Sequence, residues 1–285
     1  MLAGNTLHAD DTPVPVLCPG RGTTKHGRLW TYVRDERPFA SQMPPAVWFA
    51  YSADRKSAHP RAHLIHFHGT LHADGYAGFN GLYERTDHPL LEAACWAHAR
   101  RKFFDVNAAT PSPLALQALQ QISELYAIEA DIRGKPPDAR QAARVARAGP
   151  VLDALHRWMH ATLAQISKKS QLSGAIRYSL SRCRALTRYR DDGHIEIDNN
   201  AAERALRAVA LGRKNYLFAG SDAGAERAAA IYSLVGSAKL NGLDPEAYLR
   251  HVLTVIADHP VSRIAELLPW NLPTVIAVPA EQIAA

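Results

Sequence analysis

The sequence predicts a mixed α/β protein whose sheet-forming region is interrupted by an all-helical insertion. Three segments rich in β-branched and aromatic residues, over residues 11–17, 28–33 and 46–51, follow one another near the N-terminus. Strand and helix patterns then alternate up to about residue 106, whereas residues 107–190 carry no strand pattern and repeat apolar residues at helical spacing. A chain of 285 residues is long enough to bury a sizeable core.

The first three segments are joined by loops containing Pro or Gly, which is typical of an antiparallel meander. We expect a short helix over residues 60–67, a strand over 69–74 that ends in Asp74, and a buried strand over 92–97. His98 is then expected to open a basic helix. Strands that alternate with helices after a meander indicate a mixed sheet.

Three apolar stripes at helical spacing mark the insertion. They are Leu119, Ile122, Leu125 and Ile132; Val151, Leu155, Trp158 and Met159; and Ile176, Leu180 and Cys183. The α/β pattern resumes at Ile195. We therefore expect a first part of the core over residues 1–106, the insertion over 107–190, a second part of the core over 191–240, and a C-terminal helix and tail over 241–285.

Charge, cysteine content and the length of apolar runs narrow the expected partners and cellular location. A net charge of +6 and a pI near 9.3 tilt the choice of partner toward polyanions. The three cysteines are scattered and form no CxxC pair, so no disulfide framework or cysteine-rich zinc site is indicated, and a reducing cytoplasm is expected. No apolar run approaches the roughly 20 residues that a membrane span needs.

The stretch from Ile195 to Arg207 reads as a strand end, a cluster of cap-forming residues and a helix. Asp198, Asn199 and Asn200 all suit a helix N-cap, and Glu203 follows Asn200 at the spacing of a capping box. Two interpretations stay open. Glu203 either closes its own helix cap, or it faces an anionic substrate through a metal ion, with Arg204 and Arg207 beside it.

Asp10, within the first strand, and Asp74, at the end of the fourth, are further candidate metal ligands because strand ends often carry functional sites. A strand-end Asp before Gly75 is also a common turn residue. Carboxylates without accompanying thiolates suit Mg²⁺ or Mn²⁺, and a pair of such ions activates an attacking oxygen and stabilises the leaving oxygen of a phosphodiester. Alternation along a strand lets only one of Asp10 and Asp11 point into a given face.

Several blocks of the sequence together resemble the catalytic region of insertion-sequence transposases of the IS66 family. The blocks are His8-Ala-Asp-Asp-Thr-Pro-Val14, Ala73-Asp-Gly-Tyr-Ala-Gly-Phe-Asn80, Cys95-Trp-Ala-His-Ala-Arg-Arg-Lys-Phe103, Ile197-Asp-Asn-Asn-Ala-Ala-Glu-Arg-Ala-Leu-Arg207, Gly212-Arg-Lys-Asn-Tyr-Leu-Phe218 and Lys239-Leu-Asn-Gly-Leu-Asp-Pro-Glu-Ala-Tyr-Leu249. The resemblance covers roughly residues 5–271 in matching order. Family members carry an upstream region that recognises element ends, and this chain is expected to begin just before the catalytic region.

The resemblance implies an RNase H-like fold with a DDE triad of Asp10, Asp74 and Glu203, which would hold two Mg²⁺ or Mn²⁺ ions and support DNA strand cleavage and strand transfer. It assigns Asp10 rather than Asp11 to the triad. The partners it implies are DNA, as transposon ends and target, further copies of the chain assembled on DNA, and accessory proteins of the same element. Two other functions remain open: a truncated DNA-binding remnant without catalysis, and a metal-dependent nuclease of the same fold.

Basic residues near the triad and along the insertion are candidate DNA contacts, with solvated helix faces as the alternative. They are Arg100, Arg101, Lys102, Arg177, Arg184, Arg188, Arg204, Arg207, Arg213 and Lys214. Cys95 and His98 form a C-x-x-H pair without a second pair, so we expect a buried thiol and a hydrogen-bonded histidine there rather than zinc. The loop from Gly220 to Gly224 lacks the Lys and Ser/Thr of a P-loop, which argues against nucleotide hydrolysis.

Overall fold

The computed structural model describes residues 1–272 and contains a five-stranded mixed sheet with helices on both faces, which confirms the expected α/β class. The strands lie in the order β3-β2-β1-β4-β5. Their bounds are β1 Thr6–Val16, β2 Lys25–Arg34, β3 Ala46–Ser52, β4 Thr70–Ala73 and β5 Leu91–Ala94.

Strand pairing brings two segments that are far apart in the sequence next to each other. β1, β2 and β3 form the expected antiparallel meander, and β1–β4 and β4–β5 pair in parallel. In the parallel pair of β1 and β4, His8 lies beside His72. Asp10 and Asp74 follow this pair by two residues in their segments, so the alternation of side chains directs both toward the face of His8 and His72.

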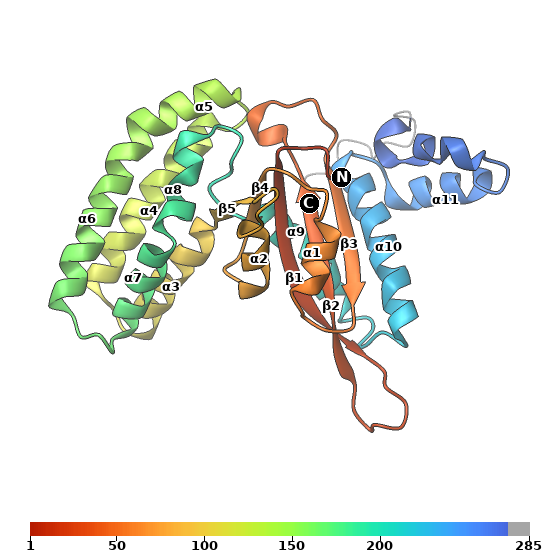
Figure 1. Ribbon diagram of the computed structural model, residues 1–285, viewed down its shortest axis with the longest axis horizontal. Coiled ribbons are helices and arrows are strands. Elements are labelled where there is room, and N and C mark those ends of the chain that lie inside the picture. The colour runs from red at the N-terminus through yellow and green to blue at the C-terminus, as the bar shows by residue number, and fades with distance from the viewer. Residues whose placement is uncertain (273–285) are drawn as a thin grey trace.

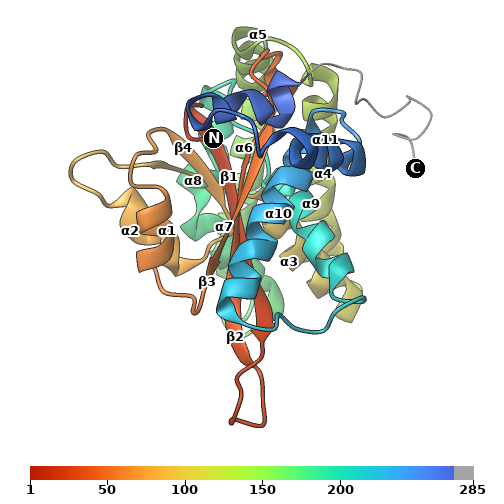
Figure 2. The ribbon, with the colours of Figure 1, turned by 90° about the vertical axis from the view of Figure 1, so that its right-hand side faces the viewer.

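The two faces of the sheet are covered by different helices (Figure 2). On one face lie α1 (Ala58–His63) and α2 (Asn80–Tyr83), and on the other lie α9 (Asn200–Gly212) and α10 (Asp222–Leu240). Leu7 and Ala9 belong to the buried cluster that includes Leu64, directly after α1, and Leu82 of α2. Because side chains alternate along β1, His8 and Asp10 face the side of α9.

The chain between β5 and α9 folds into a separate bundle of helices beside the sheet (Figure 1). The helices are α3 (Trp96–Ala109), α4 (Pro113–Ile132), α5 (Pro137–Ala143), a π-helical turn (Arg144–Ala148), α6 (Gly149–Gln165), α7 (Gln171–Ser181) and α8 (Cys183–Asp191). Residues of the three expected apolar stripes form its core, among them Ile122, Leu125, Leu155, Met159 and Ile176.

Four expectations about local structure are wrong in their bounds or continuity. The helix expected over residues 60–67 covers Ala58–His63. The strand expected over 92–97 ends at Ala94, and the basic helix begins at Trp96 rather than at His98, where the Trp96 N–H donates to the carbonyl of Ile197 (3.1 Å). The third apolar stripe does not run along one helix, because the chain breaks at Arg182 between α7 and α8.

The C-terminal part packs along the meander. α10 lies against β3, and the backbone N–H groups of Val47 and Phe49 donate to the hydroxyls of Ser237 (3.1 Å) and Ser233 (2.8 Å). α11 (Pro245–Val255) and two 3-10 turns (Val261–Leu267, Pro269–Asn271) follow. Residues 273–285 of the expected 241–285 tail lie outside the described part of the chain. Among the helices of residues 1–272, none is both long and apolar enough to cross a membrane.

Candidate functional site

The two adjacent aspartates of β1 have different environments. Asp11 has no exposed side-chain surface and is bound by Arg55, with N–O distances of 2.7–3.1 Å, and by Arg28 at 3.0 Å. Asp10 lies on the opposite face, across from Thr31, and its Oδ1 accepts only the backbone N–H of Asp11 (2.7 Å) among the described hydrogen bonds. Two arginines therefore satisfy Asp11, and Asp10 is the carboxylate left available on the side of α9.

Asp74 lies directly after β4, at the carboxyl end of the strand. Its Oδ1 accepts the backbone N–H of Tyr76 (3.1 Å), so it has the turn-forming contact that its sequence position suggests. One carboxylate oxygen in this contact leaves the other oxygen available. The turn therefore orients Asp74 without excluding it as a metal ligand.

Glu203 lies in the first turn of α9, and its carboxylate is not engaged in a capping box. α9 has no side-chain cap hydrogen bond at its N-cap, Asn199, and residues 1–272 contain no ion pair between Glu203 and Arg207. The nearest cationic or titratable partner is His98 of α3, whose Nδ1 is 3.6 Å from Glu203 Oε1. The side chain is 40% exposed. The capping interpretation of Glu203 is therefore not observed.

A buried asparagine attaches the start of α9 to the strand that carries Asp10. Asn199 is fully buried, its side-chain N–H donates to the carbonyl of Ala9 (2.8 Å), and its side-chain oxygen lies 3.1 Å from His8 Nδ1. Because an amide oxygen only accepts, His8 donates in this contact. The backbone N–H of Asn199 donates to Cys95 Sγ (3.2 Å). One side chain thus fixes the position of Glu203 relative to Asp10, a role that its place in a cap sequence did not reveal.

The charges of the three carboxylates act on one another at Asp10. Burial raises the pKa of Asp10 to about 7; the Asp11 N–H opposes this, and the negative charges of Asp74, Asp11 and Glu203 raise the pKa further. The oxygens of Asp10, Asp74 and Glu203 do not all lie within 4.8 Å of one another. As placed, the three side chains therefore do not surround one ion, although the charges of Asp74 and Glu203 still act on Asp10.

The raised pKa of Asp10 predicts a pH dependence of stability in metal-free buffer. The native state keeps the Asp10 proton up to about pH 7, whereas the unfolded chain loses it near pH 4, so native protein binds more protons in between. Stability attributable to this group therefore falls as the pH rises through that window. We expect the Tm of the wild-type chain to fall by roughly 5 °C more between about pH 5 and pH 8 than that of Asp10→Asn. Parallel Tm profiles would show that Asp10 is not the responsible group.

The candidate DNA-binding residues separate into two groups. Arg100 and Arg101 line a pocket of about 570 Å³ together with Glu203, His98 and Asn200, so they lie on the side of Glu203. The other candidates either contact protein groups outside this pocket or are exposed to solvent. Arg188 donates to the carbonyl of Glu92 (2.7 Å), Arg213 to Thr12 (2.7 Å), and Lys102 lies over the ring of Tyr178. Arg177, Arg184, Arg204, Arg207 and Lys214 are exposed.

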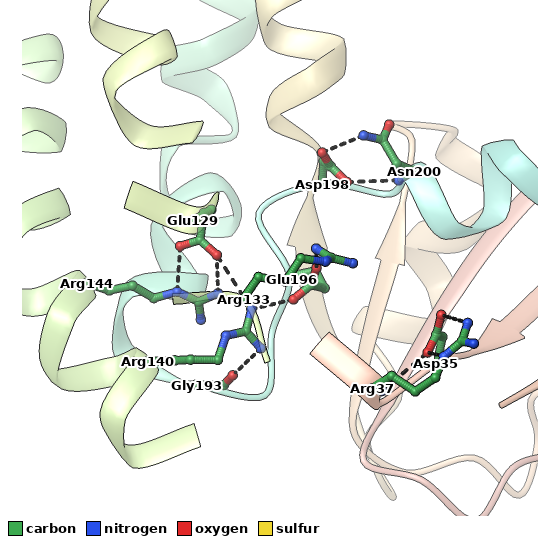
Figure 3. Close-up of polar contacts among 10 residues, drawn as sticks. All are labelled: Asp35, Arg37, Glu129, Arg133, Arg140, Arg144, Gly193, Glu196, Asp198 and Asn200. Atoms are coloured by element: carbon green, nitrogen blue, oxygen red, sulfur yellow. Dashed lines mark hydrogen bonds and ion pairs between the residues drawn. The ribbon is translucent and has the colours of Figure 1, made fainter. Parts of the chain in front are cut away.

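A buried network of arginines and glutamates joins the insertion to the segment before α9 (Figure 3). Arg144 is fully buried and holds Glu129 with two hydrogen bonds of 2.7 and 2.6 Å. Arg140 donates to the carbonyl of Gly193 (2.8 Å) and to Glu196. Burial disfavours the charge of Glu196, but Arg140 and Arg133 outweigh it and hold its pKa below the usual range. The only sequence signal was Glu196 itself, a charge between Ile195 and Ile197.

Comparison with known proteins identifies the family. Residues 1–227 match the family described as Transposase IS66 family, and residues 233–270 match the IS66 C-terminal element. The chain belongs to the IS66 transposase family. The resemblance seen in the sequence is thereby confirmed over nearly the whole chain.

The IS66 relatives include two proteins of Sinorhizobium fredii that carry the names "Uncharacterized protein y4hP" and "Uncharacterized protein y4qI". The first is 42% identical over 285 residues, covering 95% of this chain and 51% of the relative. The second is 38% identical over 274 residues, covering 94% of this chain and 51% of the relative. The chain thus spans about half the length of these IS66 relatives. No solved structure matches it.

Proposed function

We propose that this IS66 chain is the catalytic part of a DNA transposase, which cuts and joins DNA strands with Asp10, Asp74 and Glu203 as ligands of two divalent ions. The observation that carries the proposal is that Asp10 and Asp74, 64 residues apart (74 − 10), each follow the paired residues His8 and His72 by two positions, while Asn199 attaches the start of α9, which carries Glu203, to Ala9 of the same strand. We further propose that the sheet is RNase H-like. Family membership and a meander followed by parallel strands support that assignment.

The residues present fit a pair of hard cations. Mutual repulsion and burial make the charged form of Asp10 unfavourable, and bound cations would relieve both effects. Carboxylate oxygens are the ligands that Mg²⁺ and Mn²⁺ prefer. When bound, such a pair supplies activation of the attacking oxygen and stabilisation of the leaving oxygen.

The surrounding residues hold the carboxylates and the DNA. Asn199 fixes α9 against β1, so that Glu203 stays near Asp10, and the Asp74 turn orients the second carboxylate. Arg100 and Arg101 line the pocket that includes Glu203, where they bind the phosphates of a DNA strand. Cleavage and strand transfer each exchange one phosphodiester oxygen for another, so one site serves both steps.

A strand-transfer assay with pre-cut transposon ends tests this function against its alternatives. The chain is incubated with labelled ends, a target plasmid and Mg²⁺ or Mn²⁺. Joined products support the transposase. Cutting without joining indicates a nuclease of the same fold, and retention of DNA without either reaction indicates a non-catalytic remnant. Because the curated relatives are about twice as long, the same assay is also run with a full-length relative for comparison.

DNA affinity is expected to depend steeply on salt, since Lys and Arg that bind phosphates displace counterions. The double variant Arg100→Ala/Arg101→Ala should bind DNA more weakly and lower the slope of log affinity against log salt by about 0.9 for each phosphate that these arginines neutralise. The control is Arg250→Ala on α11, which lies on the far side of the sheet from α3 (Figure 1). Fluorescence anisotropy with a labelled duplex measures both slopes. Equal slopes for the wild type and the double variant would show that Arg100 and Arg101 do not contact DNA phosphates.

A further inference from the structure

Cys95, His98 and Glu203 bring three different metal-ligand atoms together beside the carboxylate triad. Their Sγ, ring nitrogen and carboxylate oxygen all lie within 4.8 Å of one another, and no other set of three His, Cys, Asp or Glu side chains in residues 1–272 does so. The sequence offered only the C-x-x-H pair, and the fold adds the third ligand from 105 residues further on (203 − 98). The expectation of a buried thiol is confirmed, and the Nδ1 of His98 has no hydrogen-bond partner among residues 1–272.

His98 points an unsatisfied atom at this cluster. Its Nδ1 is buried and has no hydrogen-bond partner, and the nearest polar atom of the cluster is Glu203 Oε1 at 3.6 Å. Buried ring nitrogens are nearly always hydrogen-bonded, so one without a partner needs a reason. A tetrahedral site with ligand distances near 2.0–2.3 Å separates its ligand atoms by roughly 3.3–3.8 Å. The His98–Glu203 spacing already has that value.

Two features beside Cys95 favour negative charge on its sulfur. Cys95 is the N-cap of α3, where the helix dipole favours negative charge, and its Sγ accepts the backbone N–H of Asn199 at 3.2 Å. Burial raises the pKa of the thiol to about 12, while the backbone N–H groups of Asn199 and His98 oppose that rise. Metal binding would release the thiol proton to solvent.

We infer that Cys95, His98 and Glu203 form a binding site for one thiophilic divalent cation of the Zn²⁺ and Co²⁺ class. A thiolate, an imidazole and a carboxylate select such ions over Mg²⁺ or Mn²⁺. Three protein ligands leave a fourth position, which faces the pocket of about 570 Å³ that His98 and Glu203 line. This binding does not depend on the proposed function. Its consequence does: an ion here occupies Glu203, so Zn²⁺ should inhibit cleavage supported by Mg²⁺.

Titration of the whole chain with Co²⁺ under anaerobic conditions tests the site without any activity measurement. A thiolate ligand gives Co²⁺ an intense charge-transfer absorption in the near ultraviolet, and tetrahedral coordination gives strong visible bands. We expect one equivalent of Co²⁺ to produce both, and Zn²⁺ to displace it. Cys95→Ser should lose the charge-transfer band, and Glu203→Gln, at a half-exposed position, should weaken binding at least about tenfold.

Cys183→Ser is the matched control, because Cys183 is a free thiol in α8 outside the cluster. It should keep the full spectrum. A wild-type chain without the charge-transfer band overturns the inference, as does a band that survives Cys95→Ser or disappears in Cys183→Ser. Circular dichroism confirms that each variant is folded, and Glu203→Gln gives an independent answer should Cys95→Ser unfold. Cleavage in Mg²⁺ without Co²⁺ binding would refute this site alone, whereas Co²⁺ binding without cleavage would refute the proposed function alone.

Discussion

Asp74→Asn is expected to reduce divalent-ion-dependent strand cleavage by at least about a thousandfold, equivalent to about 4 kcal/mol of transition-state stabilisation. The amide keeps the size of the side chain and can still accept the Tyr76 N–H, so the turn after β4 should survive. DNA retention should change little, because bulk affinity comes from Lys and Arg that neutralise phosphates. Single-turnover cleavage and anisotropy on the same preparation measure the two effects.

Two further variants sharpen this result. Asp87→Asn is the control, since Asp87 is an exposed carboxylate whose nearest cation, Arg85, lies 3.7 Å away; its activity should match wild type. Asp74→Cys should recover more activity in Mn²⁺ than in Mg²⁺, because softer ions accept sulfur. Equal loss of cleavage and DNA retention in Asp74→Asn would mean that Asp74 supports the fold rather than the reaction.

Arg144→Ala is expected to lower the free energy of unfolding by about 3–5 kcal/mol, because it leaves the carboxylate of Glu129 largely buried with its main partner removed. It also removes the donor to the carbonyls of Tyr189 (2.9 Å) and Asp192 (3.0 Å). Urea unfolding followed by circular dichroism measures the change.

Arg147→Ala is the matched control three residues further along. Arg147 pairs with Asp131 at 2.7 Å, the same distance range, but both side chains are about half exposed, so the cost should stay below about 0.5 kcal/mol. The double variant Arg144→Met/Glu129→Leu should recover most of the stability, since no charge remains buried alone. Similar losses for Arg144→Ala and Arg147→Ala would show that burial does not determine the strength of these pairs.

Much of the fold follows from local sequence. The meander was predictable because its strands are dense in β-branched and aromatic residues, and the insertion because its apolar residues repeat at helical spacing. The prediction of a strand over residues 92–97 was wrong at its C-terminal end, because a short apolar segment does not distinguish a buried strand from the start of a buried helix. There the N–H of Trp96 meets the carbonyl of Ile197, a contact that no local pattern encodes.

For the candidate site too, the sequence predicted part of the arrangement and only the fold shows the rest. The three carboxylates could be proposed from residue type and resemblance, but their proximity depends on the parallel register of β1 with β4 and on the contacts of Asn199. The orientation of Asp11 toward Arg28 and Arg55 also required the fold. Periodicity treats charged residues as solvated, so it gave no indication that Arg140 and Arg144 are buried against partners about 50 residues away.

Backbone groups of both edge strands, β3 and β5, are hydrogen-bonded to side chains from neighbouring helices. At β3, the hydroxyls of Ser233 and Ser237 take outward N–H groups that a further strand would need. At β5, the Arg188 guanidinium takes the carbonyl of Glu92. Unpaired strand margins are the usual route by which β-proteins add foreign strands or polymerise. A strand from a second molecule therefore cannot pair with β3 through the N–H groups of Val47 and Phe49, or with β5 through the carbonyl of Glu92, unless these side-chain contacts are first broken.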